Sequence, residues 1–310
     1  MHRLIIDTDP GEDDALAIMM AAAHPQARIE AITVAAGNVG LDYTANNAAV
    51  ILDLLELDIP IYRGCAQALV QSSHDASDAH GQDGLGDTGF KSDRPFEANH
   101  ASLELVNRAN AEPGELTLVT LGPLTNIALA VHLDPDLPHK FKRVVAMAGA
   151  VTGHGNTNVC TEFNVFADPE AAHVVFEAWG AAGKRIEVAD WELTMRNGFT
   201  KEVRAEWAAI NSKKSDFYTA ISAHSNRFIE EVRGRTINFF ADPVAMAVAL
   251  EPELVTQWAQ HHLGIEMTGG ISRGLTVVDW LDANGRPKNS DIAMEIDHGR
   301  LLELVVMAQS

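Results

Sequence analysis

The sequence predicts an α/β fold with an open, mainly parallel sheet flanked by helices. Three observations predict it. Short apolar runs alternate with helical stretches of about 10 to 15 residues, which is the pattern of βαβ units. The alternation stops near residue 200, where polar helical segments follow one another and indicate a helical insertion. No Pro/Ser-rich linker divides the chain, so we expect a single domain over residues 1–310.

Each element of the first 200 residues follows from a local pattern. An apolar run predicts a short buried strand at 4–6, and the uninterrupted apolar body of 13–24 predicts the helix after it. Asp168 at the N-cap and Pro169 in the first turn mark the start of a helix over 168–179. The further strands are expected at 30–36, 115–120, 143–147 and 185–188, and the further helices at 41–57 and 123–131.

The last third of the chain reads differently. Helices are expected at 201–210, 213–232 and 243–250, and strands at 264–267, 274–278 and 291–296. Two long polar loops, 67–95 and 149–164, precede this part. Loops of this length in a compact domain are often functional, and ligands of parallel sheets lie beyond the carboxyl ends of the strands, where such loops gather.

The composition excludes several classes of protein. Lys plus Arg is 23 and Asp plus Glu is 43, which gives a formal charge of -20. This balance argues against nucleic-acid and anionic-membrane partners, because phosphate contacts need clustered Lys and Arg. No segment reaches the roughly 18 apolar residues of a membrane span. Two cysteines cannot form a disulfide framework and fit a reducing compartment, so we expect a cytoplasmic protein.

The segment 7–14 is the first candidate site, because five acids fall in eight residues between a buried strand and a helix. Like charges packed together repel, and a bound cation removes that cost. Oxygen ligands select Ca²⁺ or Mg²⁺. The alternatives are helix capping with solvated charge, or an Asp nucleophile of a phosphotransferase. Gly11 and the absence of a partner lysine motif argue against the phosphotransferase.

Four weaker signals lie downstream. Residues 84–89 match G-x-G-x-x-G, but they neither follow a strand nor open a helix, so a flexible loop is favoured over a dinucleotide site. His80 is either a ligand contact or a solvated loop residue. Asn156 with 162–164 can hold hydroxyl groups or form Asx turns. Asp242 before Pro243 is a site residue or an N-cap.

Taken together, these residues resemble the inosine-uridine nucleoside hydrolase family over nearly the whole chain. The most specific match is the segment 7–15, Asp-Thr-Asp-Pro-Gly-x-Asp-Asp-Ala. The other matching segments follow in the same order: 37–38, 80–81, 121–127, Met147, 162–164 with 168–172, and 242–243.

The resemblance implies a nucleoside hydrolase-like, Rossmann-like core with the helical insertion near the active-site mouth. It implies an enzyme that cleaves the N-glycosidic bond of ribonucleosides to ribose and a free base, with Ca²⁺ as cofactor. The implied calcium ligands are Asp9, Asp14, Asp242 and the carbonyl of Leu121. Water would attack an oxocarbenium-like transition state, with Asp9 as the general base.

The resemblance also implies the substrate contacts and the assembly. The partner is a small-molecule nucleoside, and relatives are usually dimers or tetramers, so we expect a homodimer or homotetramer. Asp13 and Asn164 would bind ribose hydroxyls, Asn156 and Glu162 the 3'- and 5'-hydroxyl side, Asn38 the water and the 2'-hydroxyl, Met147 and Phe163 the sugar face, and His80 the base.

One departure concerns the leaving base. Relatives that favour inosine and uridine carry a His acid directly before the last calcium Asp, and this chain has Ala241 there. His80, His224 and Arg227 are the candidate replacements. A base that leaves without protonation, such as nicotinamide from its riboside, would also suit Ala241. The alternative function is a catalytically weak nucleoside- or ribose-binding protein that retains the calcium site.

Overall fold

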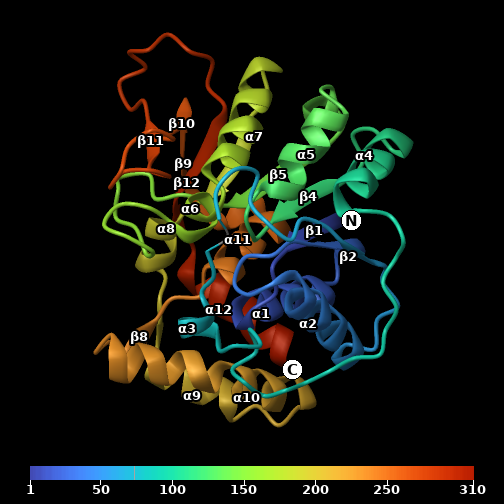
Figure 1. Ribbon diagram of the computed structural model, residues 1–310. Coiled ribbons are helices and arrows are strands. Elements are labelled where there is room, and N and C mark those ends of the chain that lie inside the picture. The colour runs from blue at the N-terminus through green and yellow to red at the C-terminus, as the bar shows by residue number, and fades with distance from the viewer. Residues whose placement is uncertain (73) are drawn as a thin grey trace.

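The computed structural model describes residues 1–72 and 74–310, and its centre is an eight-stranded sheet (Figure 1). The strand order is β3-β2-β1-β4-β5-β6-β12-β9. Seven strands are parallel, and only the edge strand β9 runs antiparallel to its neighbour β12. The predicted open, mainly parallel sheet is therefore confirmed. The strands are β1 (His2–Thr8), β2 (Ala27–Val34), β3 (Ile61–Arg63), β4 (Thr117–Thr120), β5 (Arg143–Met147), β6 (Ile186–Ala189), β9 (Val255–His261) and β12 (Ser290–Ile296).

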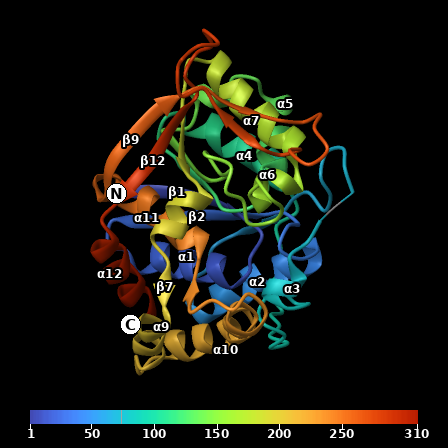
Figure 2. The ribbon, with the colours of Figure 1, turned by 90° about the vertical axis from the view of Figure 1, so that its left-hand side faces the viewer.

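Helices cover both faces of the sheet because its strands are apolar on both sides. Along β1, Leu4 and Ile6 pack into one core, and Ile5 packs into the other. Figures 1 and 2 show the resulting layers, one on each side of the sheet. The first layer holds α1 (Glu12–Ala23), α2 (Leu41–Leu54), α11 (Ala241–Leu250) and α12 (His298–Gln309), and the second holds α4 (Ala101–Ala111), α5 (Thr125–Leu133) and α7 (Pro169–Ala181).

The predicted helical insertion is also confirmed. It consists of α9 (Lys201–Ala208) and α10 (Lys213–Arg227), and a π-helical turn, Phe228–Val232, extends α10. Figures 1 and 2 show both helices outside the α1 and α2 layer. A two-stranded pair, β7 (Phe199–Thr200) and β8 (Ile237–Asn238), joins the two ends of the insertion. Helix α10 contacts α1 and the short helix α3 (Ser77–His80) of the loop 67–95.

Several elements were not predicted, for identifiable reasons. β3 is three residues long, and the edge strand β9 is largely polar, so neither carries a strong strand pattern. Helix α12 does carry a signal, since Leu301, Leu304 and Val305 are buried at helical spacing. The strands expected at 264–267 and 274–278 form a separate antiparallel pair, β10 (Leu263–Ile265) and β11 (Thr276–Val278). The remaining additions are α4, α6 (Phe163–Ala167) and α8 (Trp191–Arg196).

The sheet order fixes where a ligand can bind. Strands β2 and β3 extend the sheet on one side of β1, and β4, β5 and β6 extend it on the other. The chain therefore crosses over between β3 and β4, and β1 and β4 border the topological switch point. Asp7 of β1 is level with Thr120 of β4, so Asp9 and Leu121 follow these strands at the same edge. Within the residues the structure describes, no helix is long and apolar enough to cross a membrane.

Candidate active site

Four carboxylates from three elements meet at the switch point. Asp9 follows β1, Asp13 and Asp14 lie in the first turn of α1, and Asp242 lies in the first turn of α11. Side-chain oxygens of Asp13, Asp14 and Asp242 lie within 4.8 Å of one another. Two helix N-termini thus carry three of the four carboxylates, and the helix dipoles favour negative charge there. We call these four residues the carboxylate cluster.

Asp9 is held by backbone rather than by other side chains. Its Oδ2 accepts a hydrogen bond from the backbone N–H of Asn38 at 2.7 Å. A Cβ atom added at Gly37 would lie 2.0 Å from Oδ2, and one added at Gly122 would lie 2.4 Å from Oδ1. Only glycine fits on either side, so the Gly37–Asn38 and Leu121–Gly122 segments of the sequence form the walls around this carboxylate.

Asp14 and Asp13 are bound differently. Asp14 accepts hydrogen bonds from the Thr8 hydroxyl, from the backbone N–H of Gly11 at 2.9 Å and from the Asn38 amide at 3.1 Å. Asp13 accepts one, from the backbone N–H of Ala241 at 3.3 Å. The other oxygen of Asp13, Oδ1, is buried, and no group in the described part of the chain bonds it. Asp13 therefore has capacity for a ligand.

The electrostatics of the cluster favour a cation. Burial, and then the charge of Asp14, raise the pKa of Asp13 to about 7 and hold the pKa of Asp9 well above its usual range. Burial and the three other carboxylates do the same to the pKa of Asp242. No lysine or arginine of residues 1–72 and 74–310 forms a salt bridge with any of the four. A bound cation would lower these pKa values and neutralise the negative charge that has no basic partner.

The carbonyl of Leu121 lies beside Asn164, which connects two predicted site residues. The Asn164 amide donates to this carbonyl at 2.6 Å and to the Met147 carbonyl at 3.1 Å. Asn164 is buried and lies at the start of α6. The structure thus brings Leu121, Met147 and Asn164 together at the carboxyl ends of β4 and β5.

Glu162 forms the N-cap of α6. Its carboxylate accepts hydrogen bonds from the backbone N–H groups of Asn164 at 2.7 Å, Gly149 at 2.9 Å and Val165 at 3.1 Å. Burial nevertheless raises the pKa of Glu162 to about 7. The geometry gives Glu162 a structural task that the sequence did not indicate, and its predicted contact with the substrate stays a prediction.

Asn156 and Phe163 lie on the rim of this region. The Asn156 side chain accepts a hydrogen bond from the Thr157 hydroxyl at 3.1 Å, and its backbone N–H donates to the Thr161 carbonyl at 3.0 Å. Phe163 opens α6 and is half-buried. Their predicted contacts with the sugar stay predictions.

His80 lies against the acidic segment rather than in solvent. Its Nδ1 is 2.5 Å from Oε2 of Glu12, which is only 3 % exposed. Burial alone lowers the pKa of His80, but the Glu12 carboxylate outweighs it and raises that pKa to about 10. Glu12 is one of the five acids of the segment 7–14, and its partner was not predictable, because a contact across 68 residues has no local signal.

The two other candidates for the leaving-group acid lie on α10. Nε2 of His224 is 3.1 Å from the carbonyl of Asp78, in the loop 67–95. Arg227 is exposed. Within the described residues, neither side chain forms a hydrogen bond with the carboxylate cluster, and their predicted role stays a prediction.

The G-x-G-x-x-G segment has the loop conformation that the sequence predicted. Gly84, Gly86 and Gly89 all have positive φ. The Asp83 carboxylate holds the turn by accepting the backbone N–H groups of Leu85, Asp87 and Gly89. The segment neither follows a strand nor opens a helix. It therefore lacks the strand–turn–helix geometry of a dinucleotide site.

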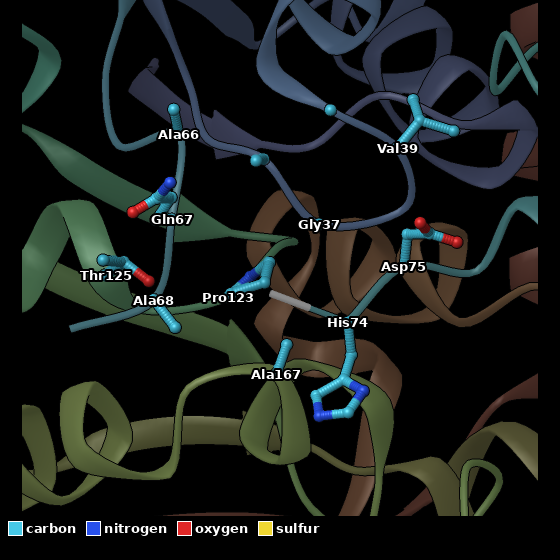
Figure 3. A pocket seen from close by; sticks show the side chains of 12 residues that line it. Gly37, Val39, Ala66, Gln67, Ala68, His74, Asp75, Pro123, Thr125 and Ala167 are labelled. Carbon is cyan, nitrogen blue, oxygen red and sulfur yellow. The ribbon is translucent and has the colours of Figure 1, made fainter. Parts of the chain in front are cut away.

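A cavity of about 90 Å³ lies between the loop 67–95 and the segments that follow β2 and β4 (Figure 3). Gly37 and Pro123 form part of its wall, and Gly37 also packs closely on the Asp9 carboxylate. His74 and Asp75 of the loop 67–95 are the ionisable residues of its lining. The cavity extends the polar region at the carboxyl edge of the sheet toward this loop.

The fold and the site define a class of protein. It is an α/β protein with an acidic cluster, able to hold a metal ion through oxygen atoms, at the switch point of a parallel sheet. The family model described as inosine-uridine preferring nucleoside hydrolase matches residues 4–303. The chain therefore belongs to this family, and it is an N-glycosyl hydrolase.

Individual relatives support the assignment over the full length. The chain is 33% identical over 298 residues to the pyrimidine-specific ribonucleoside hydrolase RihB of Escherichia coli K12, covering 96% of this chain and 93% of that protein. Among solved structures, the plant nucleoside hydrolase PpNRh1 matches with a TM-score of 0.92 at 32% identity, covering 99% and 98% of the two chains. An inosine-guanosine nucleoside hydrolase matches with a TM-score of 0.91 at 33% identity, with the same coverage.

These relatives differ in the bases that their names state. One is named for pyrimidines and another for inosine and guanosine, at the same 33% identity to this chain. Overall similarity therefore does not decide the base preference, which has to be argued from the residues of the base side.

Proposed function

We propose that the protein is a calcium-dependent ribonucleoside hydrolase that releases ribose and a free base, with an atypical base preference. The observation that carries the proposal is the carboxylate cluster. The four acids lie at the switch point, and Asp9, Asp14 and Asp242 are buried there. Within the described residues, no lysine or arginine forms a salt bridge with any of the four. A stable fold accepts such a cluster when a cation is held there.

The residues fit calcium by three criteria. The expected ligands, Asp9, Asp14, Asp242 and the Leu121 carbonyl, offer only oxygen atoms, which suit a hard divalent ion. Asp13 Oδ1 is a buried oxygen next to them without a partner in the described chain. The Leu121 carbonyl already accepts the Asn164 amide, and a carbonyl has a second lone pair for a ligand.

Calcium, when bound there, would neutralise the carboxylates and hold the ribose 2'- and 3'-hydroxyls and a water molecule. Asp9 then accepts a proton from the attacking water as the bond from C1' to the base breaks. The Asn38 N–H fixes one oxygen of Asp9, and Gly37 and Gly122 leave room for the carboxylate in this position. Asp13, Asn38 and Asn164 bind ribose hydroxyls, while Asn156, Glu162, Met147 and Phe163 line the rest of the sugar.

The base side carries the specificity. Ala241 offers only its backbone N–H, which is bonded to Asp13, so its side chain can neither protonate nor stack on a base. Among the three candidate acids, His80 is the one that lies against the acidic segment. His224 and Arg227 would have to move with the loop 67–95 or α10 to reach the base.

The proposal extends to the assembly. We take residues 1–310 as one domain of a cytoplasmic homodimer or homotetramer that acts on a free nucleoside and not on nucleic acid. Size-exclusion chromatography with light scattering checks the assembly, and a monomer at micromolar concentration would contradict it.

The test of the function is the release of reducing sugar from a panel of nucleosides. The panel is inosine, uridine, cytidine, adenosine, guanosine and nicotinamide riboside, each with calcium and with calcium removed by a chelator. We expect calcium-dependent release from at least one. If none is cleaved while ribose still raises the melting temperature, the protein is a nucleoside- or ribose-binding protein instead.

A further inference from the structure

We propose that Glu12 is a positioning residue of the reaction, holding His80 so that its Nε2 donates the proton that Ala241 cannot supply to the leaving base. The inference rests on the proposed function and adds the residue that acts on the base side. Glu12 stands between Gly11 and Asp13, at a position of the acidic segment to which the family resemblance assigns no role.

Glu12 is buried and has a single ionic partner. A carboxylate that is only 3 % exposed needs a partner, because an unpaired buried charge is costly. The partner is His80, with Nδ1 at 2.5 Å from Oε2. No lysine or arginine in the described chain forms a salt bridge with Glu12, so the imidazole is its ionic partner.

The contact with Glu12 orients the imidazole ring of His80. With Nδ1 on Glu12, the opposite nitrogen Nε2 is left for another group, and it forms no hydrogen bond with any residue that the structure describes. The ring packs against the backbone of Gly11, where an added Cβ would lie 2.9 Å from Nδ1. The contact with Glu12 and the contact with Gly11 fix the ring in two directions.

The Glu12–His80 pair lies next to Asp13, which contacts Ala241. Side-chain atoms of Glu12, Asp13 and His80 lie within 4.8 Å of one another, and Asp13 accepts the backbone N–H of Ala241. Asp13 therefore lies between His80 and Ala241, whose side chain has no proton to donate. Glu12 precedes Asp13 by one position and Asp14 by two, and its partner comes from the loop 67–95.

The chemistry balances without a further reactant. As the bond between C1' and the base nitrogen breaks, its electron pair passes to the base, which takes the proton of Nε2. Water adds to C1' and loses a proton to Asp9. The proton on Asp9 then leaves to solvent and His80 takes one from solvent, so the net reaction is nucleoside plus water to ribose plus protonated base. Glu12 stabilises the positive charge on the ring before the transfer.

The test separates leaving groups that need a proton from one that does not. The substrates are the nucleoside that the panel shows to be cleaved best and 4-nitrophenyl riboside, whose 4-nitrophenolate leaves unprotonated. We expect Glu12→Gln and His80→Gln each to lower kcat for the nucleoside by about 10²-fold, within the range of general acid catalysis, and to change kcat for 4-nitrophenyl riboside by less than about threefold.

A double-mutant cycle shows whether the two residues act together. If Glu12 acts through His80, the double variant loses no more activity on the nucleoside than His80→Gln alone. Glu12→Asp, which keeps the charge, should recover part of the loss. Glu251→Gln is the matched control, since Glu251 forms a similar pair with His24, with 3.3 Å between Oε1 and Nε2, outside the site. This variant should leave kcat for both substrates unchanged.

Three results would overturn the inference. Equal losses on both substrates would make Glu12 a structural residue, and unchanged nucleoside turnover would remove it from the reaction. A second bound metal ion per chain that disappears in Glu12→Gln would make it a metal ligand. Failure of the proposed function gives a different result, because the wild-type protein would then cleave neither substrate.

Discussion

At the scale of single residues, the site is governed by how each buried acid is compensated. Asp14 accepts three hydrogen bonds, Glu162 accepts three, and Glu12 pairs with His80. Asp9 accepts one backbone N–H and packs against Gly37 and Gly122. Asp13 accepts one long hydrogen bond, from the backbone N–H of Ala241. Asp9 and Asp13 therefore have the most capacity left for a cation, a water molecule or a sugar hydroxyl.

The first prediction concerns Asp9. Asp9→Asn keeps the shape of the side chain and its contact with the Asn38 N–H, but it removes the base and one expected calcium charge. We expect kcat to fall by about 10³-fold at saturating calcium, while the protein remains folded. Steady-state kinetics with circular dichroism as the folding control measure this, and a variant with more than a tenth of the wild-type kcat would rule Asp9 out as the base.

The second prediction concerns Glu162. Glu162→Ala leaves three backbone N–H groups without their acceptor, so we expect the free energy of unfolding to fall by about 3 kcal/mol. Glu162→Gln retains one acceptor oxygen and should cost about 1 kcal/mol. Urea denaturation measures both. A Glu162→Ala variant as stable as the wild type, with a raised KM, would mean that the residue serves the substrate and not α6.

The family resemblance, and not the spacing of the acids, connected Asp242 with the acids of the segment 7–14. The structure brings Asp13, Asp14 and Asp242 together, close enough to Asp9 for their charges to interact. The partners were not predictable in the same way. The Glu12–His80 and Glu162–Gly149 contacts depend on how loops fold back, and no periodic pattern encodes such contacts.

At the scale of elements, the loop 67–95 is held onto the insertion by close backbone packing. A Cβ at Gly86 would lie 2.3 Å from the carbonyl of Ile221 in α10, and His224 of α10 contacts the Asp78 carbonyl. His80 lies in the same loop. The loop therefore connects α10 with the site, and displacement of the loop would displace His80.

The third prediction uses two glycines of this loop as a matched pair. Gly86 and Gly89 both have φ of +69°, but only Gly86 contacts α10, since nothing lies within 4 Å of a Cβ at Gly89. Each alanine substitution costs about 1 kcal/mol of backbone strain. We expect Gly86→Ala in addition to raise KM for the nucleoside about tenfold, a loss of about 1.4 kcal/mol in binding. Equal KM values for the two variants would show that the contact with α10 does not shape the site.

Elements with strong periodicity were predicted, and weakly patterned ones were not. Residues 13–24 and 168–179 have apolar bodies or clear caps, and the corresponding helices α1 and α7 begin within one residue of the expected start. Strand β9 lies at an edge and has exposed polar residues, so its sequence resembles a loop. Helix α12 could have been recognised from its buried face and was overlooked.

At the scale of the whole molecule, the buried acids couple stability to pH and to metal. Burial raises the pKa values of Asp7, Asp13 and Glu162 to about 7 in the folded protein, from ordinary values near 4. In the metal-free protein their contribution to stability is complete below about pH 4 and is lost as the pH rises through about 7. Calcium bound to the deprotonated cluster, as we propose, would reverse this trend.

The fourth prediction follows from this coupling. The melting temperature of the metal-free protein should be lower at pH 8 than at pH 5, by about 5 °C. The increase on adding calcium should be larger at pH 8 than at pH 5. Differential scanning fluorimetry of chelator-treated, desalted protein measures both, with magnesium as the comparison ion. A calcium effect that is the same at both values of pH would mean that the ion does not bind these carboxylates.

The mainly parallel sheet was predictable, because strands that alternate with helices form βαβ units whose carboxyl ends share one edge of the sheet. The strand order, which places β1 and β4 at the switch point, was not predicted. The contribution of β12 and β9 was less predictable. They extend the sheet from a distant part of the chain, and non-local pairing of this kind leaves no signal in a single segment.

The most direct test of the central claim is a calcium titration of the metal-free protein, with release of ribose and free base as the readout. We expect no release without calcium and a rate that saturates when one ion is bound per chain, with ribose and base in equal amounts. Asp9→Asn should bind calcium weakly or turn over slowly in the same titration. Release that is unchanged after complete removal of calcium, and unaffected by its return, would mean that the hydrolase does not depend on calcium.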